Sequence, residues 1–460
     1  MSEAIKATKE TKQRAEQVSA SASEAICSRM EPMKQMLGAE GDSCSNGCRL
    51  EKMIGESSAP ACLLSDQQHS VVTLDRVCRI ALMVTPQAIG SAIDQAWEAV
   101  STIRVILKQQ AVPMTVSMQT VFVRSADDIP AFEKLFAAYF GDRVPATSFI
   151  VQPPCGGQAL AIEAWALGGD DVSVEFPLPD VVTITYDSLR WIYLAGIRPA
   201  KGSETAYDES KSVFEQLNQR LEMAGAKFRD VPRVWLYQGG ITELEDGTER
   251  YRELNRARTD FFDVQESLGQ MSVSADGQVI YPASTGIGMV GGSLTLSGMA
   301  LQTDRSDVEL RSLENPQQTS AFDYAKRFSA KSPKFARAMA VRVGNYLTTW
   351  VSGTASILDS ESVHIDDIEK QTHQTIDNIE QLIAPSNFER HSMPGCGAQL
   401  SDLAKVRVYV KRQEDYEKCR AVCESRFGAL PTIYAIADVC RPELLVEIEG
   451  VAFSSVKQPG

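Results

Sequence analysis

The sequence predicts an α/β (α+β) protein built from three copies of one β-α-β unit. Residues 402–453 read as an alternating apolar strand, a helix, a proline turn and a second strand rich in β-branched residues. Residues 123–140 align with residues 410–427 without a gap, and a proline follows each of these helices, at Pro145 and Pro431. Residues 233–300 form a looser third copy. An internal repeat of this kind outranks any local assignment.

Length and composition agree with a folded protein of several units. The chain has 460 residues, of which 43% are hydrophobic and 23% charged, as is ordinary for globular proteins. The net charge of -14 and the lack of a Lys/Arg run with interleaved aromatics argue against a nucleic-acid partner. No apolar run approaches the roughly 20 residues of a membrane span. A small anionic substrate is compatible with this charge where arginines gather.

The cysteines do not predict a disulfide framework or a metal site. Ten cysteines are scattered along a chain without a signal-peptide pattern, so reduced thiols and a cytoplasmic location are expected. Cys27, Cys44, Cys48 and Cys62 match none of the usual zinc spacings, and no histidine lies near them. We therefore expect neither a metal nor a cofactor.

The chain divides into an extension and three units. Residues 1–70, with a helix expected from Glu3 to Ser28, lie outside the repeat and form a flexible arm or a helical cap. Unit one, residues 71–170, begins with a strand at 76–84 and a helix from Pro86 through Gln110, before the strand at 115–123 and the matched helix. Unit two spans residues 180–302 and unit three residues 315–460.

An arginine-rich helix is the main polar feature of unit two. It follows a strand at 190–197 and a helix from Tyr207 to Ala224, and its sequence RYRELNRAR carries four arginines on about two turns. These arginines either form a solvated face or bind a carboxylate. For the second role we select Arg252 and Arg256, which are one turn apart, because guanidinium is the preferred planar partner of a carboxylate.

Unit three combines a packing helix, from Ile365 to Ala384, with a strand that ends at Ser352-Gly353-Thr354. The glycine there permits close approach of backbone or ligand, and the hydroxyls supply donors. Lys331, Lys334 and Arg337 belong to a basic cluster that is either a solvated loop or part of a site.

The last strand carries the candidate acid. Glu447 and Glu449 share one face of it because side chains alternate along a strand. Unit one has Ala161 and unit two Thr295 at the position of Glu447, so only unit three has a carboxylate there. Glu449 instead aligns with Glu163, which suggests a scaffold role. The alternative for Glu447 is a structural residue on a solvated strand face.

Other catalytic motifs are missing from the sequence. It contains no nucleophile elbow, no Ser-His-Asp order and no HExxH motif, and only four histidines. Any chemistry then rests on a carboxylate, a few arginines and bound water.

The repeat resembles the RidA/YjgF family. The resemblance is clearest in VSGTASI (351–357), QTHQTIDNIEQLI (371–383), KVRVYV (405–410), DYEKCRAVCESRFGALP (415–431) and LLVEIEGVAF (444–453). It implies a chorismate mutase-like fold with ligand clefts between subunits, and three units in one chain imply a covalently fused pseudo-trimer. The protein would then be a monomer or a low-order homo-oligomer.

Deaminases of that family carry an arginine directly after the marker proline, where it holds the substrate carboxylate. This chain has Ala146, Ala283 and Thr432 at those positions. An imine or enamine deaminase would need its arginine from elsewhere, and a non-catalytic small-ligand-binding protein would have the same fold with a degenerate cleft. Both remain alternatives.

Residues from about 180 to 460 are most similar to the chorismatases, which release pyruvate from chorismate. The similarity is carried by RYRELNRAR (250–258), YPASTGIG (281–288), QTSAF (318–322), SPKFARA (332–338), VSGTASI and ADVCRPELLVEIEG (437–450). It implies a hydrolase or lyase that acts on chorismate or a related enolpyruvyl acid and gives a hydroxybenzoate-type product. The first 170 residues match no part of the usual chorismatase.

The same similarity implies the site residues. Glu447 would protonate the enolpyruvyl methylene, and Gly353 with Cys440 is the pair associated with 3-hydroxybenzoate. The substrate-binding candidates are Arg252, Arg256, Phe322, Tyr324, Arg337, Gly353, Thr354 and Ala355. The chain departs from the family pattern in three places. A tyrosine is common at the position of Phe322, and the residue that follows Tyr324 and residues 328–330 also differ from those usual in the family. We expect one active cleft, bordered by units two and three.

Overall fold

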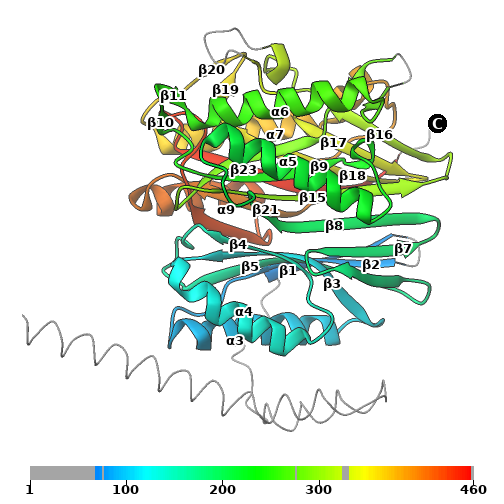
Figure 1. Cartoon of the computed structure of the whole chain (residues 1–460), viewed down its shortest axis with the longest axis vertical. Helices are drawn as coiled ribbons and strands as arrows, with labels where there is room; N and C mark the ends of the chain where they lie inside the picture. The colour runs from blue at the N-terminus through cyan, green and yellow to red at the C-terminus, as the bar shows by residue number, and fades with distance from the viewer. Residues whose placement is uncertain (1–67, 75–76, 275–276, 324–330, 457–460) are drawn as a thin grey trace, which may run out of the picture. The chain divides into compact units, whose positions relative to one another are not determined.

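The structure is a computed structural model that describes residues 68–74, 77–274, 277–323 and 331–456 (Figure 1). The helix expected from Glu3 to Ser28 and the candidate Tyr324 lie outside these ranges. Residues 131–144 belong to a separate compact unit and are described by themselves. They contain most of helix α4 (Ile129–Phe140), in which the rings of Phe136 and Phe140 meet edge to face at 6.2 Å.

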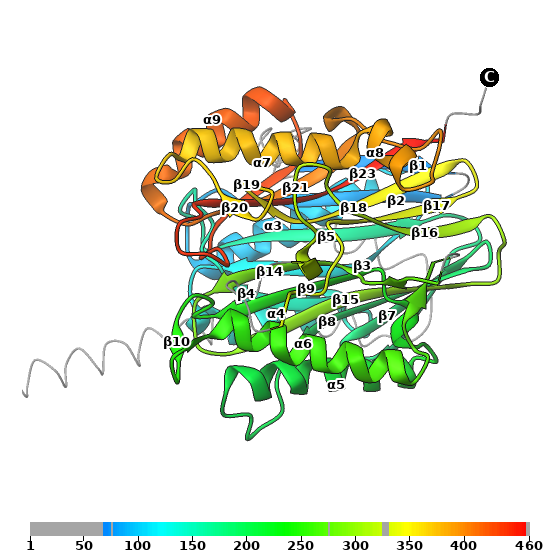
Figure 2. The same cartoon turned by 90° about the horizontal axis from the view of Figure 1, so that it is seen from above.

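Three mixed sheets form the framework of the larger unit. The first has the order β1-β2-β5-β3-β4, the second β6-β7-β8-β15-β9-β14 and the third β16-β17-β18-β23-β21-β22 (Figures 1 and 2). In each sheet a long closing strand, β5, β15 or β23, pairs antiparallel with both neighbours. The outermost pair, β3–β4, β9–β14 or β21–β22, is parallel. The three sheets therefore share the same order of five strands, to which the second and third sheets add β6 and β16 at one edge.

The strand bounds follow the sequence repeat. The first sheet comprises β1 His69–Leu74, β2 Val77–Val84, β3 Met114–Val123, β4 Ala146–Val151 and β5 Leu160–Gly168. The second comprises β6 Ser173–Leu178, β7 Val181–Tyr186, β8 Leu189–Ile197, β9 Arg233–Gly239, β14 Ala283–Met289 and β15 Leu294–Thr303. The third comprises β16 Val308–Leu313, β17 Ala338–Val343, β18 Tyr346–Ala355, β21 Leu403–Val410, β22 Thr432–Ile436 and β23 Val446–Ser455. Two-residue hairpin pairs are formed by β10 Leu244–Glu245 with β11 Thr248–Glu249, β12 Ser272–Val273 with β13 Val279–Ile280, and β19 Ile357–Leu358 with β20 Glu361–Ser362.

Two helices accompany each sheet in the chain. They are α3 Ala92–Lys108 and α4, then α5 Ala206–Met223 and α6 Arg250–Ser267, then α7 Ile368–Ile383 and α9 Tyr416–Phe427, with the short α8 Pro385–Arg390 after α7. In Figure 2, α5 and α6 lie side by side next to the second sheet, and α7 lies beside α9 next to the third. No helix in the described ranges is long and apolar enough to cross a membrane.

Helix starts correct two sequence predictions by a few residues. Helix α3 begins at Ala92, not at Pro86, because Ser91 and Asp94 form a capping box at its N-terminus. Helix α7 begins at Ile368, not at Ile365, because the Asp367 side chain accepts a hydrogen bond from the Lys370 amide. Both helices otherwise run where the apolar periodicity places them.

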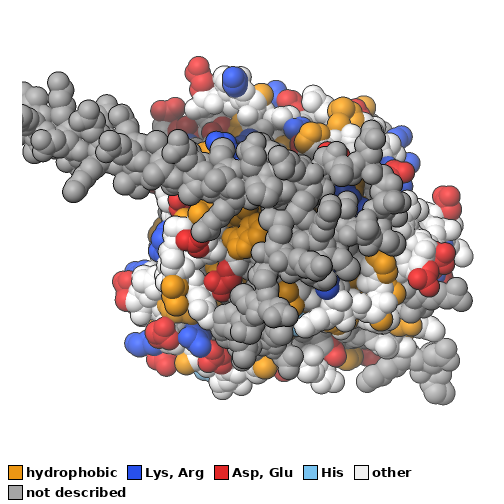
Figure 3. Space-filling model, turned by 90° about the horizontal axis from the view of Figure 1, so that it is seen from below, with side chains coloured by type: hydrophobic (Ala, Val, Ile, Leu, Met, Phe, Trp, Pro, Cys, Tyr) orange, Lys and Arg blue, Asp and Glu red, His pale blue; other side chains and the backbone are white. Residues whose placement is uncertain are grey.

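The core is shared among the sheets. One apolar cluster draws side chains from all three, including Trp165 on β5, Trp235 on β9 and Trp350 on β18. Two further clusters fill the space between the third sheet and its helices and between the second sheet and α5 and α6. On the face shown in Figure 3, basic and acidic side chains are interspersed among the described atoms.

Candidate active site

A cavity of about 200 Å³ lies where α6 and β14 of the second sheet's segment meet β18 and β23 of the third. Its lining comprises Glu249, Tyr251, Arg252, Asn255, Arg258, Ser284, Gly286, Pro333, Phe335, Arg337, Gly353, Ala355, Ile357, Cys440, Arg441, Pro442, Glu443 and Glu447. Six of the ten residues proposed from the sequence are among them, namely Arg252, Arg337, Gly353, Ala355, Cys440 and Glu447.

Glu447 is a buried carboxyl at the inner wall of this cavity. Strand register places it opposite Ala355 of β18, and the residue is only 4% exposed. Burial, together with the nearby charge of Glu449, raises the pKa of Glu447 to about 8, although Arg233 and Arg337 act in the opposite direction. Glu447 is therefore largely protonated at neutral pH. It does not lie on a solvated strand face.

The Glu447 carboxyl depends on a glycine opposite it. A methyl group built on Gly353 would lie 1.9 Å from Oε1 of Glu447 and 3.1 Å from the Thr285 methyl. No other residue type could leave the carboxyl in this position. The Gly353 amide donates a hydrogen bond of 3.0 Å to Thr285 Oγ1, which fixes the glycine against β14.

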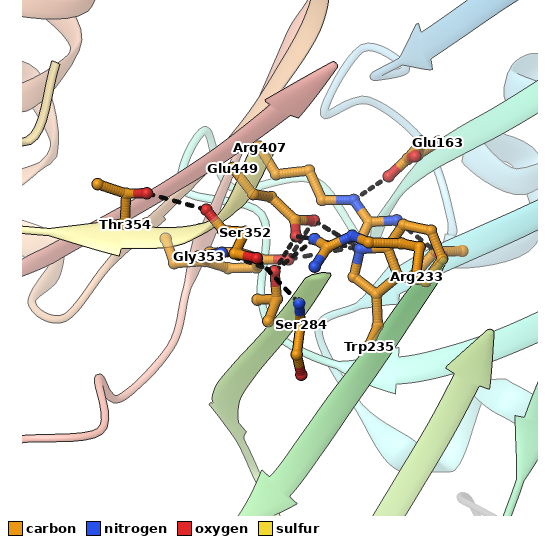
Figure 4. Close-up of polar contacts among 12 residues, drawn as sticks. Glu163, Arg233, Trp235, Ser284, Ser352, Gly353, Thr354, Arg407 and Glu449 are labelled. Carbon is orange, nitrogen blue, oxygen red and sulfur yellow. Dashed lines mark hydrogen bonds and ion pairs between the residues drawn. The ribbon is translucent and has the colours of Figure 1, made fainter. Parts of the chain in front are cut away.

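Glu449, two residues further along β23, has very different surroundings (Figure 4). It accepts from Arg233 Nη2 at 2.5 Å, Arg407 Nη1 at 2.8 Å and Trp235 Nε1 at 3.0 Å, and from the Thr285 hydroxyl. Glu163, its counterpart on β5, is likewise held by the cations Lys405 and Arg407. Both glutamates are tied into buried ion pairs and have no place in the cavity lining.

Cys440 and Arg337 flank the Glu447 carboxyl. Burial and the proximity of Glu447 raise the pKa of the Cys440 thiol to about 12, so that it stays a neutral thiol. Arg337 is 4% exposed and donates from Nη2 to the Thr319 carbonyl at 3.3 Å. Its guanidinium lies 5.3 Å from the centre of the Phe335 ring. A cation, a thiol and a protonated carboxyl thus share one wall.

Helix α6 supplies the opposite wall and a second buried cation. Arg258 is 1% exposed, and it donates to the Asn255 side chain and, at 3.4 Å, to Ser284 Oγ. The Tyr251 side chain also forms a hydrogen bond with Arg258. Gly286 leaves room for the Tyr251 ring, because a methyl group built on Gly286 would lie 3.1 Å from the ring. Within the described ranges no carboxylate forms an ion pair with Arg258. Its charge is therefore available to an anionic ligand.

Three of the proposed residues, Arg256, Thr354 and Phe322, are not among the lining residues. Arg256 pairs with Glu253 and stacks on the Tyr207 ring at 3.8 Å. The Thr354 hydroxyl points into the strand and donates to the Ser352 carbonyl at 3.0 Å. Phe322 is 39% exposed and lies 5.9 Å from Tyr281. Tyr324 falls outside the described residues.

Sequence patterns alone did not single out Tyr251, Asn255 and Arg258, which are the α6 residues that converge on the cavity. Their spacing of four and three marks one face of a helix, one residue out of phase with the pair that we selected, Arg252 and Arg256. Arg252 lines the cavity from its edge and pairs with Glu249 at 3.1 Å. The arginine run was the right signal, but it does not reveal which helix face turns inward.

Among the described residues, no group of three or more His, Cys, Asp or Glu side chains could hold a metal ion.

Comparison with known proteins assigns the chain to a family. The family "Chorismatase FkbO/Hyg5-like, N-terminal" matches residues 182–300, and "Endoribonuclease L-PSP", the RidA-like family, matches residues 330–454. The chain is 33% identical over 297 residues to the 3-hydroxybenzoate synthase of Streptomyces hygroscopicus, covering 63% of this chain and 80% of that protein. This chain belongs to the chorismatase family. A chorismatase of Streptomyces rapamycinicus is 32% identical over 277 residues, 58% of this chain and 78% of that protein.

The fold of a solved chorismatase extends further along the chain than the sequence similarity does. Its crystal structure superposes with a TM-score of 0.57 at 22% identity, covering 83% of this chain and 99% of that one. Residues 180–460 alone make up about 61% of the 460 residues, so the match continues N-terminal of residue 180. The expectation that the first 170 residues have no chorismatase counterpart is therefore wrong at the level of the fold.

Proposed function

We propose that this protein releases pyruvate from chorismate, or from a closely related enolpyruvyl acid, and forms a hydroxybenzoate-type product by general acid catalysis. The observation that carries the proposal is Glu447, a carboxyl that keeps its proton at neutral pH inside a cavity with buried arginines. The names of the chorismatase relatives supply the substrate.

The chemistry follows from the position of that proton. Glu447 protonates the methylene carbon of the enolpyruvyl ether, and positive charge develops on the ether carbon as an oxocarbenium-like centre. Water or the neighbouring ring hydroxyl captures this centre and returns a proton to the Glu447 carboxylate.

With water as the nucleophile, collapse of the hemiketal breaks the bond between the ether oxygen and the ether carbon and releases pyruvate and a dihydroxylated ring, which becomes aromatic only by losing water. With the ring hydroxyl as the nucleophile, collapse of the cyclic ketal breaks that bond and also the bond between the hydroxyl oxygen and the ring, so that pyruvate leaves with the former hydroxyl oxygen. The ring carbon that bears the ether oxygen then loses its proton, which passes to that oxygen, and the ring becomes aromatic. When the ring hydroxyl is the nucleophile, chorismate divides into pyruvate and hydroxybenzoate with no net consumption of water.

Two buried arginines match the two carboxylates of chorismate. Arg258 on α6 and Arg337 before β17 lie on opposite walls of the cavity, and guanidinium binds carboxylate in a planar, charge-assisted pair. A substrate carboxylate paired with Arg337 would also neutralise its positive charge. Arg337 would then no longer lower the pKa of Glu447. Substrate binding would then strengthen the protonated form of the acid.

Gly353 and Cys440 are proposed to bias the outcome toward 3-hydroxybenzoate. Gly353 keeps space beside Glu447, and the neutral Cys440 thiol offers a weak donor next to the reacting ring. One of the relatives is named for that product. Arg252 at the cavity edge and Ala355 opposite Glu447 complete the proposed substrate contacts.

The decisive experiment measures pyruvate release from chorismate together with the aromatic product. The parent protein should form both, and Glu447→Gln should lose about 10² to 10⁴ in kcat, because general acid catalysis supplies about that factor. Glu309→Gln on β16, outside the cavity, is the matched control and should keep the parental rate. Parental turnover by Glu447→Gln would overturn the assignment of the acid, and inactivity of both proteins toward chorismate would overturn the substrate.

We also propose a pseudo-trimeric arrangement of three RidA-like units, residues 71–170, 180–302 and 315–460, with residues 1–70 as an extension. The shared topology of the three sheets supports it.

A cytoplasmic location is proposed on the free thiols of the described cysteines, Cys78, Cys155, Cys396, Cys419, Cys423 and Cys440. We further propose a monomer or a low-order homo-oligomer.

A further inference from the structure

A β-bulge lies at the wall of the active cavity, which Gly353 lines. The register of β18 against β23 shifts between Val351 and Thr354. Ser352 and Gly353, which lie between them, therefore face the single residue Glu449. A bulge leaves backbone groups without partners in the sheet ladder, so other elements must hold these groups if the bulge is to keep its shape.

Hydrogen bonds to the second sheet hold this bulge. The Gly353 amide donates to Thr285 Oγ1 of β14 at 3.0 Å. One residue earlier on each strand, the Ser284 amide donates to Ser352 Oγ at 2.9 Å (Figure 4). The side chains of these two serines and of Thr285 belong to residues that are at most 4% exposed, so water does not compete for the bonds. The bulge is thus tied to β14 at two adjacent points.

The Thr285 hydroxyl has a fixed orientation. It donates to the Glu449 carboxylate, which can only accept, and it accepts from Arg233 Nη2 at 2.6 Å as well as from the Gly353 amide. A hydroxyl has one donor and two acceptor sites, so all three are in use. The buried ion pair between Arg233 and Glu449 therefore also fixes the group that holds Gly353.

The position of Gly353 decides whether the Glu447 carboxyl fits beside it. A methyl group on Gly353 would lie 1.9 Å from Glu447 Oε1, so the carboxyl occupies the space that a side chain would fill. A small shift of the bulge toward Glu447 would close this space and displace the carboxyl. The burial that raises the pKa of Glu447 depends on the same space.

We infer that Thr285 is a positioning residue, whose hydroxyl holds Gly353 against β14 and thereby keeps the Glu447 carboxyl in place for proton transfer to the substrate. Thr285 is not among the lining residues of the cavity, so it acts through Gly353. Its effect on turnover rests on the proposed function, whereas its effect on the carboxyl does not.

Three variants separate the hydroxyl from the rest of the side chain. Thr285→Val keeps the shape and removes the hydroxyl, and it should lower kcat with chorismate by about 10-fold, since one buried hydrogen bond contributes about that factor. Thr285→Ser should keep a kcat near that of the parent, because the hydrogen bond to Gly353 persists. Thr349→Val on β18 is the matched control and should keep the parental kcat, since Thr349 Oγ1 is buried and has no hydrogen-bond partner among the described residues.

The two substitutions of Thr285 also give the results that would overturn the inference. Parental kcat in Thr285→Val would show that the hydroxyl is not needed. A loss of about 10-fold in Thr285→Ser would show that the methyl group holds the bulge instead, and it decides the matter even if Thr285→Val does not fold.

A double-mutant cycle tests the same placement without a substrate. Glu447→Gln is introduced into the parent and into Thr285→Val, and unfolding by denaturant is measured at pH 5 and pH 8. If the carboxyl moves toward water in Thr285→Val, the pKa of Glu447 should fall from about 8 by about one unit. The effect of Glu447→Gln on the pH dependence of the unfolding equilibrium constant should then be roughly 5- to 10-fold smaller in the Thr285→Val background.

The cycle distinguishes a failure of this inference from a failure of the proposed function. An equal effect of Glu447→Gln in both backgrounds would overturn the role of Thr285, whether or not the protein turns over chorismate. A smaller effect in Thr285→Val, together with a parent that is inactive toward chorismate, would confirm that Thr285 positions the carboxyl and overturn the substrate.

Discussion

At the scale of single residues, Glu447 and Glu449 show how one strand face can carry two different functions. They are equally buried, at 4% exposure each, yet Glu449 receives several donors and Glu447 faces a cavity. The difference arises from β9, which brings Arg233 and Trp235 to Glu449 but no cation into contact with Glu447. Fixed donors hold Glu449 in a structural ion pair, while the absence of such donors raises the pKa of the buried Glu447 and lets it retain a proton.

The protonation of Glu447 predicts a pH effect on stability. Its pKa is about 8 in the folded protein and about 4.3 in an unfolded chain, so between these values the folded state binds more protons. The contribution of protonated Glu447 to the free energy of unfolding is fully present below about pH 4 and is lost as the pH rises toward 8. From pH 5 to pH 8, Glu447→Gln should therefore gain stability relative to the parent, by an amount on the order of a few kcal/mol.

Chemical denaturation at several pH values measures this gain. Cys440→Ser is the control from the same cavity wall, because the thiol, with a pKa of about 12 in the folded protein, does not titrate between pH 5 and pH 8. Its stability should differ from that of the parent by a nearly constant amount. Parallel curves for Glu447→Gln and the parent would show that Glu447 is ionised throughout.

Gly353→Ala should act through the position of Glu447. The new methyl group would collide with Oε1, and since this is the end of a flexible side chain, the carboxyl should move while the fold persists. We expect kcat to fall by at least tenfold or the product mixture to shift, with an unfolding temperature close to that of the parent. Gly292→Ala is the control, because the added methyl group would stand in open space. The neighbouring Gly291 is unsuitable because of its positive φ. An unchanged rate and product profile for Gly353→Ala would show that this glycine does not shape the site.

At the scale of elements, the sequence repeat predicted most of the strands and helices, and periodicity explains why. Apolar alternation located β3, β21 and β23, and the 3.6-residue pattern located α5 and α7, since both signals are local. Helix starts were displaced where a cap lay inside the expected helix, as at Ser91. Capping depends on the path of the preceding loop, which periodicity does not describe.

The candidate site was only partly predictable at this scale, because it is made where elements distant in sequence meet. The face of α6 that turns inward is decided by packing against β14, where Gly286 admits Tyr251 and Ser284 meets Arg258. That contact selects the face with Asn255 and Arg258 over the face with Arg256. The burial of Glu447 similarly depends on β18, and no pattern within β23 distinguishes it from Glu449.

At the scale of the whole molecule, equivalent positions on the three closing strands each contact the next sheet. Glu449 on β23 binds Arg233 of the second sheet, and Glu163 on β5 binds Arg407 of the third. Ser297 on β15, the corresponding position in the second sheet, shares a 2.6 Å hydrogen bond with Ser148 of the first. The contacts run in one cyclic direction, which supports the proposed pseudo-trimer.

The proposed ring of three units predicts that the chain does not need partner chains to complete its fold. The three sheets already contact one another within one chain, so covalent linkage supplies the neighbours that separate subunits would otherwise have to supply. Light scattering should give the 50.4 kDa mass of one chain or a low multiple of it. The unfolding temperature and the activity per chain should not change on dilution, because no folding interface dissociates. A homotrimer that loses its fold and its activity together on dilution would contradict the internal ring, since its sheets would then be completed by other chains.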